Sequence, residues 1–321
     1  MTIGWIEKIR RHAAVATGDF GRMFRDVKIP PLPAAAVRLV GEMNKPEPDP
    51  KQLVRILSGS PELAARVLQT VNSSYFSLGH RVTTLPHAIS LLGMRQIRSI
   101  ALSYTMVSGV PRPKDDGLFD HEAFWIDSLI RTLIARSLAR RQGLHDEEEA
   151  FTAMLLADVA LPVLLVAWRE YYAPIVERWA ESDERLSRIE RENLRWDHAQ
   201  AGAWILRSWG FPEEIVCFVG AHNLSAEELA EAELENTIAL PMSVASLAPS
   251  VLRRNEERVS LFAAETRRRF GIDDDGFRGL IDETRTGLDE IRSLFGLGDR
   301  GVGETLDAIA AAGAADAGGT A

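Results

Sequence analysis

The chain has 321 residues, 46% of them hydrophobic and 26% charged, so it is long enough for one large or two small domains with real cores. Its longest apolar stretch, residues 155–168, contains Asp158 and Pro162 and is shorter than the roughly 20 apolar residues of a membrane-spanning helix. The first residues lack an apolar run of signal-peptide length, and the single cysteine, Cys217, cannot form an intrachain disulfide, which together predict a cytoplasmic protein.

The net charge of −9 is distributed unevenly along the chain. Residues 1–110 contain 14 Lys/Arg and 7 Asp/Glu, a net charge of +7, whereas the remainder contains 23 and 39, a net charge of −16. No acidic residue lies between Glu62 and Asp115. The early part could therefore attract an anionic ligand or partner, although arginines that are solvated or loosely paired explain the same pattern.

The first hundred residues predict short helices separated by proline and glycine. An amphipathic lead helix is expected within residues 1–25, and Ile29-Pro-Pro-Leu-Pro33 predicts an extended entry, because proline fixes φ and lacks an amide hydrogen. Ser60-Pro61-Glu62 has the hydroxyl, proline and acid that are typical of a helix start. Helices are expected over residues 34–43, from 51 to a break at 58–60, from 61 to about 71, and over 85–92 and 94–107. Gly93 separates the last two.

Longer helices are expected beyond a Pro- and Asp-rich joint at residues 111–117. No segment of five or more residues alternates apolar and polar side chains with β-branched enrichment, so we expect essentially no sheet. Residues 225–297 should continue as helices, and the Ala/Gly-rich segment 298–321 should be disordered. Between the joint at residues 111–117 and residue 225, helices are expected over residues 122–142, 146–168, 170–182, 199–209 and 212–220.

Eight short segments follow one another in an ordered series. In the first half they are residues 29–33, 58–68, 71–76 (Val-Asn-Ser-Ser-Tyr-Phe) and 85–98; in the second half they are 124–128, 153–160, 197–200 (Asp-His-Ala-Gln) and 210–215. In order and spacing these segments resemble the HDOD domain, over roughly residues 26–225. The resemblance implies an all-α, HD-domain-like helical bundle with an N-terminal sub-bundle of short helices.

The same resemblance suggests how the chain is divided. We expect an N-terminal helical lead at residues 1–25, an HDOD domain at 26–225, a C-terminal helical extension at 226–297 and a disordered tail at 298–321. HDOD domains are related to the HD metal-dependent phosphohydrolases, occur in bacterial regulatory proteins and often lack demonstrable hydrolase activity.

A working HD site holds one or two metals with several imidazoles and carboxylates, including an adjacent His-Asp pair, and the metal activates the attacking water. Here that pair is Ala157-Asp158, and the helix position that often carries histidine is Asp127. His198 and His222 remain, but 240–248 supplies no acid for the later aspartate. We therefore expect no metal cofactor and no catalysis, with these four residues as polar remnants of the bundle or, alternatively, as ligands of one weakly bound divalent ion.

Two further groups of polar residues lie outside this set. The remaining histidines fall in no metal-ligand spacing and are expected to be surface or capping groups: His12, His80, His87, His121 and His145. The turn at Asn72, Ser73 and Ser74 is expected to be a polar capping turn, or else to bind an anionic ligand or partner together with Arg95 and Arg98.

The leading functional hypothesis is a non-catalytic signal-transduction module that acts through contacts with a regulatory protein partner. One alternative is a metal-dependent phosphohydrolase acting on a nucleotide or cyclic nucleotide. The other is a receptor for an anionic second messenger or nucleic acid, which rests on the acid-free stretch between Glu62 and Asp115.

Overall fold

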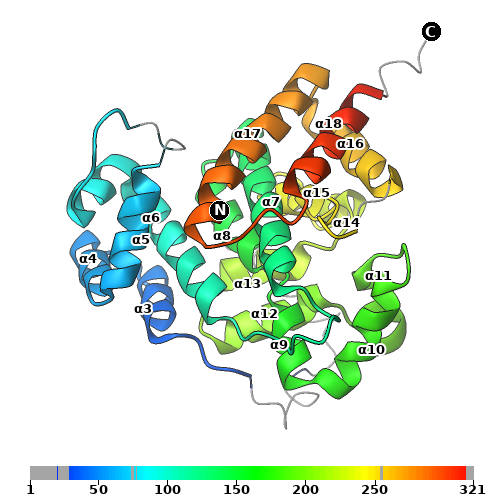
Figure 1. Cartoon of the computed structure of the whole chain (residues 1–321), viewed down its shortest axis with the longest axis horizontal. Coiled ribbons are helices and arrows are strands. Elements are labelled where there is room, and N and C mark those ends of the chain that lie inside the picture. The colour runs from blue at the N-terminus through cyan, green and yellow to red at the C-terminus, as the bar shows by residue number, and fades with distance from the viewer. Residues whose placement is uncertain (1–19, 21–28, 74–75, 77, 254–255, 316–321) are drawn as a thin grey trace. The chain divides into compact units, whose positions relative to one another are not determined.

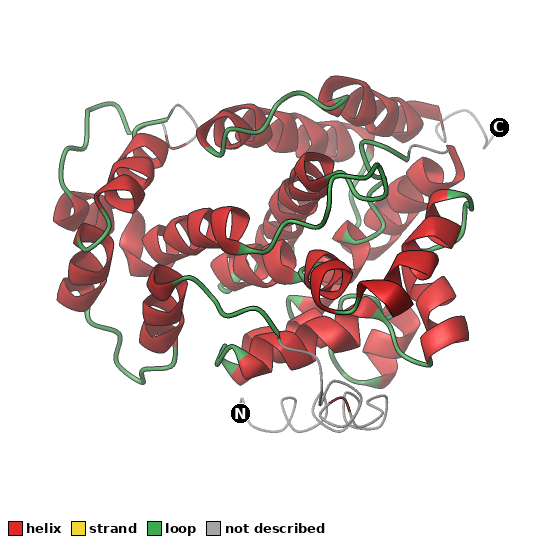
Figure 2. Ribbon diagram, turned by 60° about the horizontal axis from the view of Figure 1, so that its bottom comes forward, coloured by secondary structure: helices red, strands yellow, loops and turns green. Residues whose placement is uncertain are grey.

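The computed structural model describes residue 20 and residues 29–73, 76, 78–253 and 256–315 (Figure 1). Regular structure in these ranges is helical (Figure 2). The only pairing of strand type among them is one isolated bridge between Ser250 and Arg253. The all-α prediction is confirmed. The expected lead helix lies outside the described residues except for Phe20, which is helical and buried.

The helices form two compact units, and each unit is built from two separated stretches of chain. The first unit comprises residues 1–119 and 156–220, and the second comprises residues 120–155 and 221–321. Residues 120–155 group with the C-terminal helices in the second unit, and the division expected from the sequence stays a prediction.

The first stretch of unit 1 consists of short helices that pack on one long, kinked helix. Prolines at the first position begin two of them, and the Asp49 carboxylate caps the first of these by accepting the Lys51 amide at 2.9 Å. The long helix bends at Gly93, whose φ of 81° and ψ of 159° interrupt it, as the sequence predicts. Their bounds are α3 Ala34–Met43, α4 Pro50–Ser58, α5 Pro61–Val71 and α6 Leu85–Gly109, and α3, α4 and α5 all contact α6.

The second stretch of unit 1 carries the short helices that hold the candidate site. Helix α9 packs on both α10 and α12, and α11 packs on α10 and α12. Their bounds are α9 Ala160–Ala167, α10 Arg169–Ala180, α11 Leu186–Leu194, α12 His198–Ser208 and α13 Glu213–Ala221. The expected helix over 146–168 is divided by a three-residue turn at 157–159, and α11 was not among the predicted helices.

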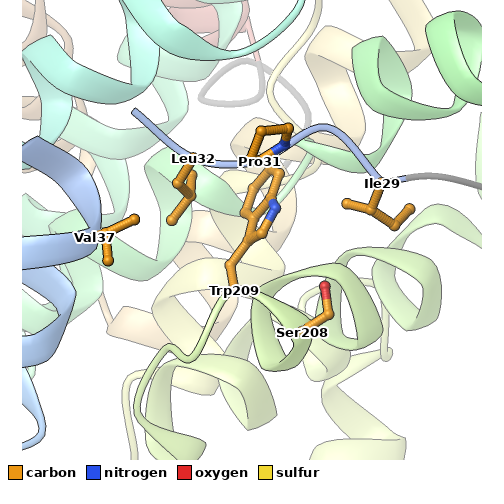
Figure 3. A pocket seen from close by; sticks show the side chains of 6 residues that line it. All are labelled: Ile29, Pro31, Leu32, Val37, Ser208 and Trp209. Atoms are coloured by element: carbon orange, nitrogen blue, oxygen red, sulfur yellow. The ribbon is translucent and has the colours of Figure 1, made fainter. Parts of the chain in front are cut away.

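The proline-rich segment Ile29–Pro33 ties the two stretches of unit 1 together. The indole Nε1 of Trp209, just after α12, donates to the carbonyl of Pro30 at 2.9 Å, and the ring of Pro33 lies so close to Gly109 that no Cβ would fit there. An open apolar groove of about 420 Å³ lies beside this segment, with Trp209 at its centre (Figure 3). Its lining residues are Ile29, Pro31, Leu32, Val37, Ser208 and Trp209.

Unit 2 is organised around one long helix that is buried along most of its length. This helix, α7, contacts α15 and α17, and Asp120 caps it by accepting two amides at 3.0 Å. Polar and charged side chains reinforce the packing: Ser137 and Arg140 both donate to Glu283 of α17, at 2.7 Å and 3.0 Å. The bounds in this unit are α7 His121–Arg141, α8 Glu147–Leu156, α14 Ala226–Glu231, α15 Ala239–Ala245, α16 Glu256–Phe270, α17 Asp274–Leu294 and α18 Val302–Ala315.

The last of these helices corrects the prediction of a disordered tail. Helix α18 occupies residues that were expected to be unstructured, and it contacts α16 and α17. The side chains of Val302, Leu306 and Ile309 recur at helical spacing and are at most 3% exposed. The Ala/Gly-rich composition concealed this apolar stripe.

The stretch from Glu147 to Ala167 has the length and apolar composition of a membrane span, which the shorter range 155–168 lacked. However, 89% of its most apolar 18-residue part is buried in the structure, as in the core helix of a globular protein.

Candidate functional site

The structure brings two of the four candidate metal ligands, Asp158 and His198, together within unit 1. Asp158 lies in the turn between α8 and α9, and His198 is the first residue of α12. Their side chains are 10% and 7% exposed, and Asp158 Oδ1 lies 3.3 Å from His198 Nε2. The remaining two candidates, Asp127 and His222, belong to unit 2.

The start of α12 holds His198 in a fixed orientation. Asp197 is the N-cap, and its carboxylate accepts the amides of Ala199 and Gln200 while the Gln200 side chain accepts the Asp197 amide, which completes a capping box. Arg195 precedes this cap with a φ of 70°, a left-handed conformation that ends α11 and turns the chain into α12. The cap and the turn together direct the imidazole into the interior of unit 1.

Two residues that the sequence did not single out, Glu190 and Tyr172, also contribute to the surroundings of His198 within unit 1. Glu190 Oε2 lies 2.6 Å from His198 Nδ1 and also accepts the backbone amide of His198 at 2.9 Å. The hydroxyl of Tyr172 donates to the other oxygen of Glu190. Because Tyr172 and Glu190 are both fully buried, this chain of hydrogen bonds is shielded from solvent.

The electrostatics of the network favour a charged imidazole. Burial alone lowers the pKa of His198, but the negative charges and hydrogen bonds of Glu190 and Asp158 outweigh burial and raise this pKa to about 10. For Tyr172, burial and the adjacent Glu190 carboxylate raise the pKa of the phenol well above its usual value, so the hydroxyl keeps its proton. An imidazolium between two carboxylates therefore dominates at neutral pH.

Asp127 has a structural task in unit 2. Its Oδ1 accepts the backbone amide of Val251 at 2.8 Å, and the side chain is buried in α7. This hydrogen bond fits the interpretation of Asp127 as a polar group that holds the bundle together. His222 follows α13 by one residue and is 1% exposed.

Within unit 1, Asp158 and His198 contribute one carboxylate and one imidazole to a group of potential metal-ligand atoms that lie within 4.8 Å of one another. Catalytic zinc sites use three protein ligands plus a water. A metal at Nε2 of His198 would have to displace the proton that the two carboxylates favour on the imidazole.

The side chain of Asn72, in the turn that is a candidate anion site, hydrogen-bonds to backbone groups. The Asn72 amide nitrogen donates to the carbonyls of Leu68 and Val82, and its oxygen accepts the Val82 amide, all at 2.7 Å. Asn72 therefore behaves as the capping-turn alternative predicts. Ser73 is partly buried, Ser74 lies outside the described residues, and on α6 Arg95 is exposed and Arg98 partly buried.

Glu190 could have been found from the helical pattern of its own segment. It lies four residues after Leu186 and next to Ile189, both buried, so it falls on the apolar face of α11. A carboxylate at such a position needs a partner. Tyr172 gives no comparable signal, because a tyrosine among apolar residues is common.

The comparisons with known proteins match this architecture. The family model of the HDOD domain matches residues 29–225, close to the range expected from the sequence. The chain belongs to the HDOD domain family. Its lead, its C-terminal helices and its last residues lie outside the match.

Solved structures share the HDOD fold over most of the chain. A candidate phosphohydrolase of Shewanella amazonensis SB2B is 24% identical with a TM-score of 0.61, covering 93% of this chain and 97% of that one. An HDOD domain protein of unknown function from Geobacter sulfurreducens is 19% identical with a TM-score of 0.66, covering 89% and 98%. A candidate signal transduction protein of Marinobacter aquaeolei VT8 is 19% identical with a TM-score of 0.62, covering 92% and 67%. At these identities the likeness shows the fold alone.

A curated relative from Treponema pallidum (strain Nichols), named only as an uncharacterized protein, is 23% identical over 199 residues. The match covers 61% of this chain and 37% of that protein, so the chain spans little more than a third of the relative's length.

Proposed function

We propose that this HDOD protein is a non-catalytic signal-transduction module that acts in the cytoplasm through contacts with a regulatory protein partner. Its helical surfaces, rather than a reaction centre, would carry the function. The name of the Marinobacter aquaeolei structure agrees with a signalling role for such folds.

The observation that carries the proposal is the hydrogen-bonded network around His198. Both ring nitrogens face carboxylates, Glu190 at 2.6 Å and Asp158 at 3.3 Å, and the position before Asp158 is occupied by Ala157 instead of an imidazole. The positive charge that a metal would supply to Asp158 is thus supplied by the protein itself. A divalent ion in this position would have to displace the His198 proton before it could polarise a phosphoryl oxygen or acidify a water.

The main alternative is a metal-dependent phosphohydrolase that binds its metal with an incomplete set of protein ligands. The Shewanella amazonensis structure is named as a candidate phosphohydrolase. To decide between them, the full chain is purified without chelators, its metal content is measured by mass spectrometry, and hydrolysis of phosphodiesters and cyclic nucleotides is assayed with added Mg²⁺, Mn²⁺ or Zn²⁺. We expect well under one ion per chain in the Asp158 site and no turnover above background.

Two variants make this test specific. Asp158→Asn removes the carboxylate of the candidate site, and Asp307→Asn serves as the control at an aspartate that is 73% exposed and is not a candidate ligand. Stoichiometric metal together with turnover that Asp158→Asn abolishes and Asp307→Asn retains would overturn the proposal.

The anion-receptor alternative has its own measurement. Binding of cyclic nucleotides or single-stranded nucleic acid at low salt should be absent in the wild-type chain. Affinity that weakens with salt, and weakens further in Arg95→Ala and Arg98→Ala, would support that alternative instead.

A further inference from the structure

A pair of histidines outside the His198 network lies at the surface of unit 1. The rings of His80 and His87 have centroids 5.5 Å apart and planes inclined by 23°, and both side chains are exposed. The pair was not expected from the sequence, because a separation of seven residues across a loop matches no usual ligand spacing.

Backbone contacts fix the positions from which both imidazoles project. His80 lies in the loop between α5 and α6, two residues before Val82, whose amide and carbonyl are both held by Asn72 at 2.7 Å. His87 is in the first turn of α6, where the Thr84 hydroxyl caps the helix by accepting the His87 amide at 3.4 Å. The loop and the helix start therefore hold the two rings near each other before any ligand arrives.

The spacing of the rings suits a shared transition-metal ion. A metal about 2.1 Å from a ligating imidazole nitrogen lies about 3.2 Å from the ring centroid. For centroids 5.5 Å apart, the angle at the metal is then about 120°, close to that of a tetrahedral or trigonal centre. Because both side chains are exposed, rotation about their Cβ–Cγ bonds can direct one nitrogen of each ring to the same ion.

We propose that His80 and His87 form a surface site for one divalent transition-metal ion of the kind that imidazole prefers, with water completing its coordination. The chemistry of the donors excludes hard ions: Mg²⁺ and Ca²⁺ require oxygen ligands, and residues 63–114 contain no carboxylate. Nickel, copper and zinc suit imidazole, and copper should bind most tightly of the three.

The bound ion would cross-link the loop before α6 to the first turn of α6. It would join residues on either side of the Thr84 cap and so stabilise the short helices that pack on α6. The neighbouring Arg81 is also exposed, and its positive charge opposes cation binding, so the site should be weaker than a structural zinc site.

The test is titration of the full chain with Cu²⁺, Ni²⁺, Zn²⁺ or Mg²⁺, followed by calorimetry and thermal denaturation. We expect one Cu²⁺ per chain, weaker Ni²⁺ and Zn²⁺ binding, no Mg²⁺ binding, and a rise in melting temperature that a chelator reverses. Electron paramagnetic resonance of the Cu²⁺ complex should show two coordinating imidazole nitrogens.

Conservative variants locate the ion. His80→Gln and His87→Gln should each weaken Cu²⁺ binding about tenfold or more, or about 1.4 kcal/mol. The control His145→Gln, at another exposed histidine, and the control Asp158→Asn should both retain the wild-type affinity. Absence of Cu²⁺ binding, unchanged affinity in both His80→Gln and His87→Gln, or loss of binding in Asp158→Asn would each overturn the site, and circular dichroism checks that every variant is folded.

Discussion

His198 is surrounded by groups that stabilise its charged form, and this has a consequence for the stability of the protein. The pKa of His198 is raised from 6.5 to about 10 on folding, so the folded chain holds a proton that the unfolded chain releases above pH 6.5. The stabilisation is fully present below pH 6.5 and is lost as pH rises through 10.

We therefore predict that the free energy of unfolding, measured by urea denaturation, falls between pH 7 and pH 9.5. The slope due to this one residue is at most about 1.4 kcal/mol per pH unit. His198→Gln should flatten the decline, whereas His145→Gln, at an exposed histidine, should leave it unchanged. Equal slopes in the wild type and His198→Gln would show that the buried imidazole does not carry a proton.

At the scale of single residues, the sequence identifies the candidates better than it identifies their tasks. The resemblance to the HDOD domain directs attention to Asp127, Asp158 and His198, all of which are buried. It does not reveal that Asp127 holds the Val251 amide or that Glu190 faces His198. Those pairings join segments that are distant along the chain or separated by a cap, and only the folded backbone brings them together.

At the scale of elements, the interruption in α6 depends on the backbone conformation of one glycine. Gly93 adopts a φ of 81° and a ψ of 159°, a conformation that side chains with a Cβ rarely adopt, although no atom would obstruct a Cβ there. The requirement is therefore one of backbone conformation and not of space.

Gly93→Ala should lower the free energy of unfolding by about 1–3 kcal/mol, because alanine is strained in this conformation. Gly41→Ala is the matched control: Gly41 is exposed in α3, also with open space around its Cα, and alanine favours a helix there by up to about 1 kcal/mol. Urea denaturation of both variants measures the contrast. If Gly93→Ala left the free energy of unfolding unchanged, α6 could straighten without loss of packing.

Helix boundaries followed the sequence closely where proline and capping residues mark them. The starts at Pro50 and Pro61 and the interruption at Gly93 agree with the local signals, because these residues restrict the backbone by themselves. Helix α11 has weaker signals, since its N-cap residue Arg185 makes no side-chain cap, and it depends on packing against α10 and α12.

For the whole molecule, α18 is the clearest difference between expectation and structure. Its stability comes from contacts with α16 and α17, which local composition does not encode. Leu306→Ala should therefore lower the free energy of unfolding by about 2–5 kcal/mol, because Leu306 is fully buried.

Thermal and urea denaturation measure this effect, and Asp307→Ala is its neighbour control. Asp307 is 73% exposed and forms an ion pair with Arg285 at 2.6 Å, so its removal should change stability by less than about 1 kcal/mol. If Leu306→Ala is as mild as Asp307→Ala, the segment contributes nothing to the fold, as its composition first suggested.

The division of each unit between two stretches of chain also bears on how the protein is made. Helix α7 packs on α15 and α17, yet the HDOD match ends at residue 225, before either partner begins. A fragment cut at that boundary would leave the apolar surface of α7 without these two helices. Roughly 100 residues separate the end of α7 from α15. Because the ribosome adds roughly 5–20 residues per second, the apolar surface of α7 stays uncovered for about 5–20 s before α15 is synthesised. The nascent chain is thus open to aggregation or chaperone binding during that interval, and its C-terminal helices end the exposure.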